Sequence, residues 1–394
     1  MTYSVYQHWD PLEVCIVGRS YSPEFYHYIE NIKVREVFER IARETEEDYQ
    51  KLITLLESFG VDVVRPNVGD NYLDYINHRG TVRPPPMTPR DYTLMLGDKF
   101  YHIKLDRLLH ESWDQYKAPD WPESFPTDMN NLPDGLTQDM IIAKFNEFER
   151  MKPHNTHNTW QPVFDKVTPT LLSADHHDTW VRIRDMNGAN WTRIGTDLYI
   201  GNAPDDPPEK QIDERSRAWF DDNLPQYRVH MVNSQGHVDG AFCPVKPGLI
   251  ISLYDISNFA ETFPNWEVVY LPDQSWAQVH PFLDLKKKNQ GKWWVPGEEL
   301  NDDFTDFVNQ WMDHWVGHVE ETVFDVNMLV IDEQNVVCNN YNKDVFDAFE
   351  RHGVTPHIVN FRHRYFWDGG LHCITSDISR RGGVMKDYFP ERNK

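Results

Sequence analysis

The sequence predicts an α/β fold made of repeated strand-strand-helix-strand modules, and the two ends of the chain show the pattern most clearly. Near the start, residues 14–18 form an apolar run that is typical of a buried strand. Residues 32–59 then place apolar side chains at helical spacing, Gly60 stands where a helix ends, and residues 61–64 form the next strand. The same order recurs further along the chain, which favours one repeated unit.

The C-terminal end shows this order after a hairpin. The apolar segments 326–331 and 336–338 flank a turn-like tetrapeptide. Residues 344–352 follow as a short helix with three apolar side chains on one face. Gly353 stops that helix, and residues 354–359 form the returning strand.

Three further hairpins are expected between these ends, at residues 92–103, 190–201 and 241–253. The second of them is followed by a helix over residues 209–222. About five such modules would account for most of the chain. Two less regular segments are rich in Pro, Asp, His and Trp, and we expect long ordered loops near a site or surface insertions there: residues 113–134 and 152–179.

Composition excludes several function classes. The 394 residues allow two or three domains, or one large domain with a sizeable core. No run of about 20 apolar residues occurs, so no membrane span is expected. The net charge of −23 disfavours nucleic acid as a partner, because phosphate binding needs a basic surface. Such a charge would suit a cationic small molecule, although simple solubility also explains most of it.

Cysteine usage and the N-terminus predict a reduced, cytoplasmic protein. The four cysteines are scattered without CxxC spacing, which argues against a disulfide framework or a zinc site. The first residues show neither the basic start nor the apolar stretch of a signal peptide. The chain carries no phosphate loop, dinucleotide fingerprint or metal constellation, so we expect no cofactor and no metal. The His-rich segment 175–178 is expected to be a solvated loop.

Cys373 is the leading candidate for a catalytic residue. It follows two glycines and His372, and the chain also carries His237 two residues before Asp239. A thiolate is a strong nucleophile, and a nearby imidazole can lower the thiol pKa and move protons to and from a reacting group. Paired glycines let the backbone adopt conformations closed to other residues, which can present a side chain to a substrate. The alternative is a small buried cysteine beside an ordinary turn.

The run from residue 371 to residue 382 reads Leu-His-Cys-Ile-Thr-Ser-Asp-Ile-Ser-Arg-Arg-Gly. It closely resembles the nucleophile segment of the amidinotransferases, especially glycine amidinotransferase and inosamine-phosphate amidinotransferase. Further matches occur in the right order, at residues 89–91, 189–197, 227–230, 237–242 and 327–333. The resemblance implies the pentein α/β propeller, in which five strand-rich modules surround a central active site, as a single domain over residues 1–394.

The resemblance also implies a covalent ping-pong mechanism. Cys373 would attack the guanidinium carbon of a donor such as arginine, ornithine would leave, and an acceptor amine would then take the amidino group from the sulfur. His237 would be the acid and base, because its ordinary pKa lies near neutrality. Asp239 would orient His237 or bind the guanidinium, and an extended segment would put both side chains on one side. Asp91 would contact the guanidinium or the acceptor, with a turn after Pro89 as its alternative role.

Two positions depart from the amidinotransferase pattern. Asn187 stands where these enzymes have a catalytic aspartate, so it would accept a hydrogen bond from a guanidinium without supplying charge. Asp185 or Asp239 would compensate, or the replacement marks different chemistry or another donor. Glu320 and Glu321 stand near the paired serines of glycine amidinotransferase. These carboxylates would favour a cationic acceptor, such as an amine or diamine, over glycine; an exposed turn is the alternative.

Three functions remain open from the sequence. The favoured one is an amidinotransferase with arginine as donor. The second is a guanidine hydrolase of the same superfamily, such as an arginine deiminase or dihydrolase, and the third is a guanidino-compound binder without catalysis. Arg362 is included among the candidate substrate-binding residues. The expected partners are a small guanidine donor and an amine acceptor, and relatives in this family are commonly homodimers.

Overall fold

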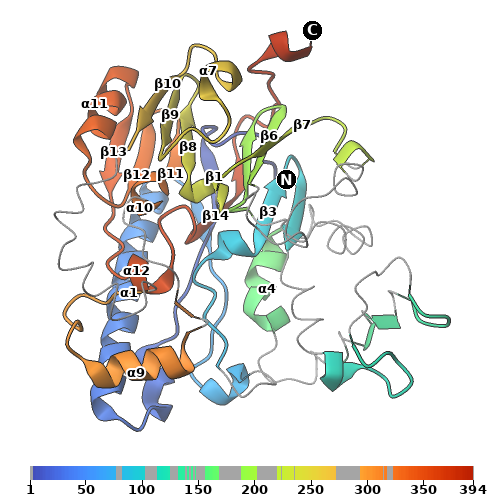
Figure 1. Cartoon of the computed structure of the whole chain (residues 1–394), viewed down its shortest axis with the longest axis vertical. Coiled ribbons are helices and arrows are strands. Elements are labelled where there is room, and N and C mark those ends of the chain that lie inside the picture. The colour runs from blue at the N-terminus through green and yellow to red at the C-terminus, as the bar shows by residue number, and fades with distance from the viewer. Residues whose placement is uncertain are drawn as a thin grey trace.

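The protein has an α/β fold of small sheets and flanking helices (Figure 1). In the view of Figure 1 the sheets gather in the upper half, and the long helix α1 extends below them. A computed structural model describes residues 3–76, 82–102, 113–124, 132–137, 140–141, 143–144, 147, 156–167, 188–201, 220–222, 224–234, 236–271, 293–313, 315–316 and 323–393.

Within these residues the strands form five separate sheets. Four of them have three strands and one is a two-stranded hairpin. Short apolar runs account for these strands, because most of their side chains are buried. In sheet order the members are β14 (Thr375–Arg380), β1 (Leu12–Val17) and β2 (Asp62–Val64); β3 (Thr93–Leu96) and β4 (Lys99–His102); β5 (Trp191–Ile194), β6 (Asp197–Gly201) and β7 (Arg228–Val232); β10 (Glu267–Tyr270), β9 (Leu249–Ser252) and β8 (Phe242–Lys246); β11 (Leu329–Asp332), β12 (Asn335–Cys338) and β13 (Thr355–Ile358).

Each three-stranded sheet has the same internal order. An antiparallel pair is followed by a third strand that lies parallel to its neighbour, as in β5–β6–β7 and β11–β12–β13. Where the connection to the third strand is fully described it contains a helix, such as α7 (Phe259–Thr262) before β10 and α11 (Lys343–His352) before β13. The predicted strand-strand-helix-strand module is therefore confirmed.

The module at the N-terminus is completed by the C-terminal end of the chain. β1 pairs antiparallel with β14, and β2 lies parallel to β1 on its other side. The helix of this module is α1 (Ile32–Ser58), which has the extent that the apolar spacing predicts. The sequence did not predict β14, whose pairing places the loop before Thr375 at the end of β1 where Val17 lies.

The helix ends follow local sequence signals. Asn31 caps α1 by accepting a hydrogen bond from the Lys33 amide, and Asn342 caps α11 in the same way. Gly353 ends α11 with φ of +66°, a conformation that glycine adopts without strain. The other described helices are α4 (Thr156–Val167), α9 (Asp302–Trp311), α10 (Val323–Val326), α12 (Arg364–Trp367) and the 3-10 turns η1 (Pro23–Tyr28), η2 (Tyr72–Tyr75), η3 (Pro89–Asp91), η4 (Val238–Gly240) and η5 (Pro390–Asn393).

Two expectations about secondary structure were wrong. Residues 156–167, expected to lie in a loop, form α4, whose apolar face packs Trp160, Val163 and Val167 into the core. The strand expected from residue 326 begins only at Leu329, because Val326 ends α10 and residues 327–328 connect that helix to the strand. Only residues 220–222 of the helix expected over 209–222 lie within the described part, and the His-rich segment 175–178 lies outside it.

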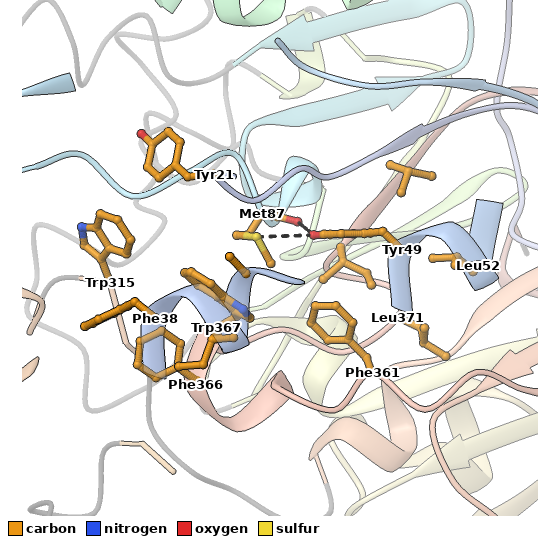
Figure 2. Packing of buried hydrophobic residues seen from close by; sticks show 14 of the residues in the cluster. Tyr21, Phe38, Tyr49, Leu52, Met87, Trp315, Phe361, Phe366, Trp367 and Leu371 are labelled. Atoms are coloured by element: carbon orange, nitrogen blue, oxygen red, sulfur yellow. Dashed lines mark hydrogen bonds between the residues drawn. The ribbon is translucent and has the colours of Figure 1, made fainter. Parts of the chain in front are cut away.

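A large aromatic core joins α1 to the C-terminal part of the chain. Figure 2 shows Phe38 of α1 beside Phe366 and Trp367 of α12, and Tyr49 further along α1 near Phe361. Leu371, just before the candidate nucleophile, belongs to the same buried cluster, which fixes the loop that carries Cys373. No helix in the described ranges is long and apolar enough to cross a membrane.

Candidate active site

Cys373 lies in the loop between α12 and β14. It follows two glycines at positions where a larger side chain would clash with its neighbours. A Cβ on Gly370 would stand 2.7 Å from the Cβ of Asn327, and one on Gly369 would stand 2.9 Å from Cγ2 of Thr88. Neither glycine has a positive φ, so the expected conformational reason for them is wrong. The left-handed residue of this loop is Asp368, with φ of +52°.

Asn327, which precedes β11, holds the nucleophile loop in place. Its Oδ1 accepts hydrogen bonds from the backbone amides of His372 at 2.9 Å and of Cys373 at 3.0 Å. Its Nδ2 donates to the Cys373 sulfur at 3.1 Å and to the Asp239 carbonyl at 3.2 Å. One buried amide side chain therefore ties the thiol to the turn that carries Asp239.

The His237–Asp239 segment is a 3-10 turn, which corrects the expectation of an extended segment. The Gly240 and Ala241 amides donate to the carbonyls of His237 and Val238, so the turn points its side chains in different directions. Asp239 is 95% buried, and its Oδ2 lies 3.5 Å from the Cys373 sulfur. The side chain of His237 is 49% exposed.

Asp91 lies on the outer side of the site with His237. Nδ1 of His237 and Oδ1 of Asp91 are 3.8 Å apart, so the two side chains form an ion pair when the imidazole is protonated. Asp91 ends η3, and the backbone of this turn is fixed to the nucleophile loop by Arg90, whose Nε donates to the His372 carbonyl at 2.8 Å. Two carboxylates, an imidazole and a thiol therefore come together from three distant parts of the sequence.

The thiol lies in a negative environment. Burial raises the pKa of Cys373 well above its ordinary value, and the charges of Asp239, Asp91 and Asp368 raise it further. The hydrogen bond from Asn327 acts in the opposite direction, but does not outweigh them. The thiol is therefore protonated near neutral pH unless a cation binds beside it.

His372 is the inner partner of Asp239. Its Nδ1 donates to Oδ2 of Asp239 at 2.7 Å, with both side chains buried. Burial and the charge of Arg90 lower the pKa of His372 to about 4, although the bond to Asp239 opposes this shift. Burial alone would raise the pKa of Asp239, but the hydrogen bond from His372 and the charges of His237 and Arg90 lower it overall. Asp239 is thus an anion beside a neutral imidazole.

A second cluster lies directly behind the nucleophile loop. Asp377 of β14 accepts hydrogen bonds from Arg90 at 3.1 Å, Arg193 at 2.8 Å and Arg380 at 2.7 Å. All four side chains are almost completely buried. The guanidinium groups also donate to the carbonyls of residues 95, 330 and 372, which belong to or precede different sheets. This network fixes η3, β5 and β14 relative to one another.

The remaining candidate residues divide into two groups. Arg362 lies outside the thiol cluster: its Nε donates to Asp48 of α1 at 2.9 Å and its Nη2 donates to Glu47 at 2.7 Å. Its guanidinium is therefore occupied by carboxylates of α1. Four candidates lie outside the described residues: Asp185, Asn187, Glu320 and Glu321.

Sequence reasoning overlooked three residues of the site: Asn327, His372 and Asp368. Asn327 and His372 lie within the runs that resemble the amidinotransferases, so those runs were the available signal. Nothing in the local sequence distinguished Asp368 from a turn residue before glycines.

Cys15, Cys243 and Cys338 are buried free thiols, and burial raises the pKa of Cys15 and Cys243 to about 12.

The fold places the chain with solved amidinotransferases. An amidinotransferase of the saxitoxin biosynthetic pathway from Microseira wollei superposes with a TM-score of 0.59 at 16% identity, over 99% of this chain and 100% of that one. The inosamine-phosphate amidinotransferase of Streptomyces griseus gives a TM-score of 0.57 at 18% identity, over 98% and 99% of the two chains. The α/β part of the predicted fold class is confirmed.

Particular relatives agree with this class. The mitochondrial glycine amidinotransferase of Xenopus tropicalis is 23% identical over 420 residues, which cover 98% of this chain and 84% of that protein. The L-arginine:L-lysine amidinotransferase of Pseudomonas savastanoi pv. phaseolicola is 24% identical over 233 residues, about half of each chain (54% and 53%). No family model matches the chain. The resemblance to the amidinotransferases, and with it the expected enzyme class, is confirmed.

Proposed function

We propose that the protein transfers the amidino group of a guanidine donor, L-arginine in the first instance, to an acceptor amine through an S-amidino intermediate on Cys373. One observation carries this proposal. The Cys373 sulfur lies 3.5 Å from the ionised carboxylate of Asp239, and within the described residues no lysine or arginine side chain bonds that carboxylate. A planar cation beside the sulfur would satisfy the charge of Asp239.

The donor guanidinium would bind between the inner and outer carboxylates. Oδ1 of Asp239 is buried and accepts no hydrogen bond within the described part of the chain. A guanidinium N–H group directed at this oxygen would complete its hydrogen bonding, and Asp91 would contact the outer edge of the same group. Asn187 would supply a neutral acceptor, so the two aspartates would carry most of the charge recognition.

Binding of the cation would also activate the thiol. The three carboxylates that raise the pKa of Cys373 would be neutralised in part by the guanidinium, so the pKa would fall when the donor is bound. The thiol would therefore ionise with substrate in place and stay protonated without it. This order limits reaction of the sulfur with other electrophiles.

The chemistry would proceed in two balanced half-reactions. In the first, the Cys373 thiolate forms a bond to the guanidinium carbon, the bond from that carbon to the ornithine nitrogen breaks, and His237 gives its proton to the departing amine. In the second, an acceptor amine attacks the same carbon and loses a proton to His237, while the carbon–sulfur bond breaks and restores the thiolate. The exposed position of His237 suits exchange of that proton with the substrate and solvent.

The five sheets are consistent with a pentein propeller. We infer that they are the modules of a pentein propeller, with the loop of Cys373 and the turns η3 and η4 at its centre. Four of the five described sheets share one strand order, which supports a repeated module. A single domain, a homodimer and a cytoplasmic location stay predictions.

Product analysis would test the proposed function. The protein is incubated with L-arginine alone and with each member of a panel of amines, and ornithine, citrulline and urea are measured. We expect ornithine to be released continuously only with an acceptor, and a guanidino product to form in equal amount. Citrulline or urea without an amine would instead indicate a hydrolase, and binding of arginine without any turnover would indicate a guanidino-compound binder.

A further inference from the structure

Asp368 has an unusual backbone conformation beside the nucleophile. Its φ of +52° and ψ of +51° lie in the left-handed region, which costs a residue with a Cβ about 1 kcal/mol. Asp and Asn tolerate this region better than other side chains, and glycine adopts it freely. A charged residue kept in a conformation that suits glycine is a candidate for a functional role.

The residues on both sides of Asp368 hold it in this conformation. Trp367 and Leu371 are 4% and 0% exposed and belong to the aromatic core, where Figure 2 shows both side chains. Nε1 of Trp367 also donates to Oγ1 of Thr45 on α1 at 2.9 Å. The short turn between these two buried residues therefore has little freedom to relax, and Asp368 is presented from a rigid support.

This turn places Asp368 next to the thiol but on its solvent side. A Cβ built on the adjacent Gly369 would lie 3.6 Å from the Cβ of Cys373, so the backbone after Asp368 packs against the nucleophile. The side chain of Asp368 is exposed, whereas Asp239 is buried on the inner side of the sulfur. Asp368 also contributes to the negative potential at the sulfur. An exposed carboxylate whose charge is felt at the sulfur would act on the non-reacting end of a substrate whose reacting carbon lies at that sulfur.

We propose that Asp368 is a specificity-determining residue that selects acceptor amines with a second positive charge over acceptors that carry a carboxylate. This inference rests on the proposed transfer function and adds the charge class of the acceptor. It depends on Asp368 alone and not on Glu320 or Glu321.

The charges of the two substrates explain why the effect falls on the acceptor. The non-reacting end of arginine carries one ammonium and one carboxylate, so a nearby carboxylate attracts one group and repels the other. A diamine has only an ammonium at that end, and an amino acid acceptor that reacts through its distal amine brings a zwitterion. A simple amino carboxylate has only a carboxylate there, and Asp368 repels it.

Three acceptors with four carbon atoms each would measure this selection. They are 1,4-diaminobutane, 1-aminobutane and 4-aminobutanoate, whose far ends carry a positive charge, no charge and a negative charge. The kcat/KM of each is determined for the wild type and for Asp368→Asn, which keeps the shape and tolerates the left-handed conformation. Glu261→Gln removes an exposed carboxylate from α7 and serves as the matched control for net charge.

We expect the wild type to prefer the diamine, then the neutral amine, then the amino carboxylate. In Asp368→Asn the ratio of kcat/KM for the diamine to kcat/KM for the amino carboxylate should fall about three- to tenfold. This is the range expected for an exposed charge pair when the lost attraction of the diamine and the lost repulsion of the carboxylate are combined. Raising the salt concentration should lower the same ratio in the wild type and have less effect in the variant. Glu261→Gln should keep the wild-type ratio.

The first half-reaction distinguishes the two ways of failing. If arginine gives a stoichiometric burst of ornithine while the acceptor ratio is the same in the wild type and Asp368→Asn, the inference about Asp368 is wrong and the transfer function stands. If the wild type gives no ornithine with arginine under any condition, the proposed function is wrong and the inference fails with it.

Discussion

The thiol of Cys373 and the carboxylate of Asp377 lie four residues apart in the sequence, yet their surroundings are opposite. Asp377 is bonded by three guanidinium groups and is almost completely buried. Burial alone would raise its pKa, but these three cations hold the pKa well below its ordinary value. Cys373, in contrast, is buried beside carboxylates, and burial and then these charges raise the pKa of its thiol.

The difference separates a structural charge cluster from a site for substrate. Around Asp377 the protein supplies its own cations, and each of them also donates one N–H group to a backbone carbonyl of a neighbouring element. Around Cys373 the protein supplies anions, and the cation must come from outside. Arg90 belongs to both regions, because its backbone leads to Asp91 and its guanidinium binds Asp377. The guanidinium cluster therefore acts as the rigid structural support of the site.

The largest expected effect on stability comes from removing the anion that the guanidinium cluster shares. Asp377→Asn leaves three buried guanidinium groups without their shared anion, and removing one partner of a buried ion pair costs about 3–5 kcal/mol. We expect the free energy of unfolding in urea to fall by this amount. A loss below about 1 kcal/mol would contradict a structural role for the cluster. Glu261→Gln serves as the control for removal of an exposed charge.

Asp239→Asn tests the other side of the comparison. Removing this charge should lower kcat/KM for arginine about 10²- to 10³-fold, comparable with the loss of one charge-stabilising group in other active sites. The pKa of Cys373 should fall at the same time, because Asp239 raises it. Iodoacetamide should then alkylate Cys373 faster at pH 8 in the variant than in the wild type. Slower alkylation would show that the carboxylate does not suppress the thiolate.

His372→Asn sharpens the account of the inner hydrogen bond. The pKa of His372 in the folded protein is about 4, below its ordinary value of 6.5. Between pH 4 and pH 6.5 the unfolded chain is therefore protonated at this residue and the folded protein is not. The contribution of neutral His372 to the free energy of unfolding is fully present above pH 6.5 and is lost as the pH falls towards 4. We expect the wild type to lose about 2 kcal/mol between pH 7 and pH 5 through this residue.

Asn keeps an N–H donor near the position of Nδ1, so the variant should fold and show a smaller loss over this interval. Part of the loss should remain, because burial also lowers the pKa values of His8 and His363. The measurement is the urea midpoint at each pH. Identical pH responses in wild type and variant would mean that His372 is not held neutral by the fold.

The smallest effect is expected for Arg362→Gln. The guanidinium of Arg362 is partly exposed and binds Asp48, which also pairs with Lys51. Its removal should lower stability by about 1 kcal/mol or less, since solvent screens this pair and Lys51 remains. The KM for arginine should stay within about twofold of the wild-type value. A tenfold increase in KM would return Arg362 to the substrate-binding residues.

Much of the fold could be predicted from local patterns. Apolar runs and helical spacing located α1, α11 and most hairpins, because these features depend on neighbours in the sequence. The pairing of β14 with β1 could not be predicted in this way, since the two strands lie at opposite ends of the chain. The 3-10 turn of Val238–Gly240 was also missed, because a short His-x-Asp segment has no periodicity that distinguishes a turn from a strand.

The site was predicted in part, and the rest depends on long-range contacts. Cys373, His237 and Asp239 were proposed from their residue types, the resemblance gave them roles and added Asp91, and the structure brings the four together. The roles of Asn327 and His372 follow from hydrogen bonds between distant segments, which composition and spacing do not reveal. Arg362 was assigned to a substrate, although carboxylates of α1 already bind it.

The intact mass of the protein after reaction with arginine shows whether Cys373 carries the amidino group. The wild type is mixed with L-arginine without an amine, quenched in acid, weighed and digested to locate any added group. We expect the gain of one amidino group on Cys373, its disappearance when an acceptor is added, and no gain in Cys373→Ser. Continuous turnover of arginine by Cys373→Ser, or an amidino group on any other residue, would contradict the covalent mechanism.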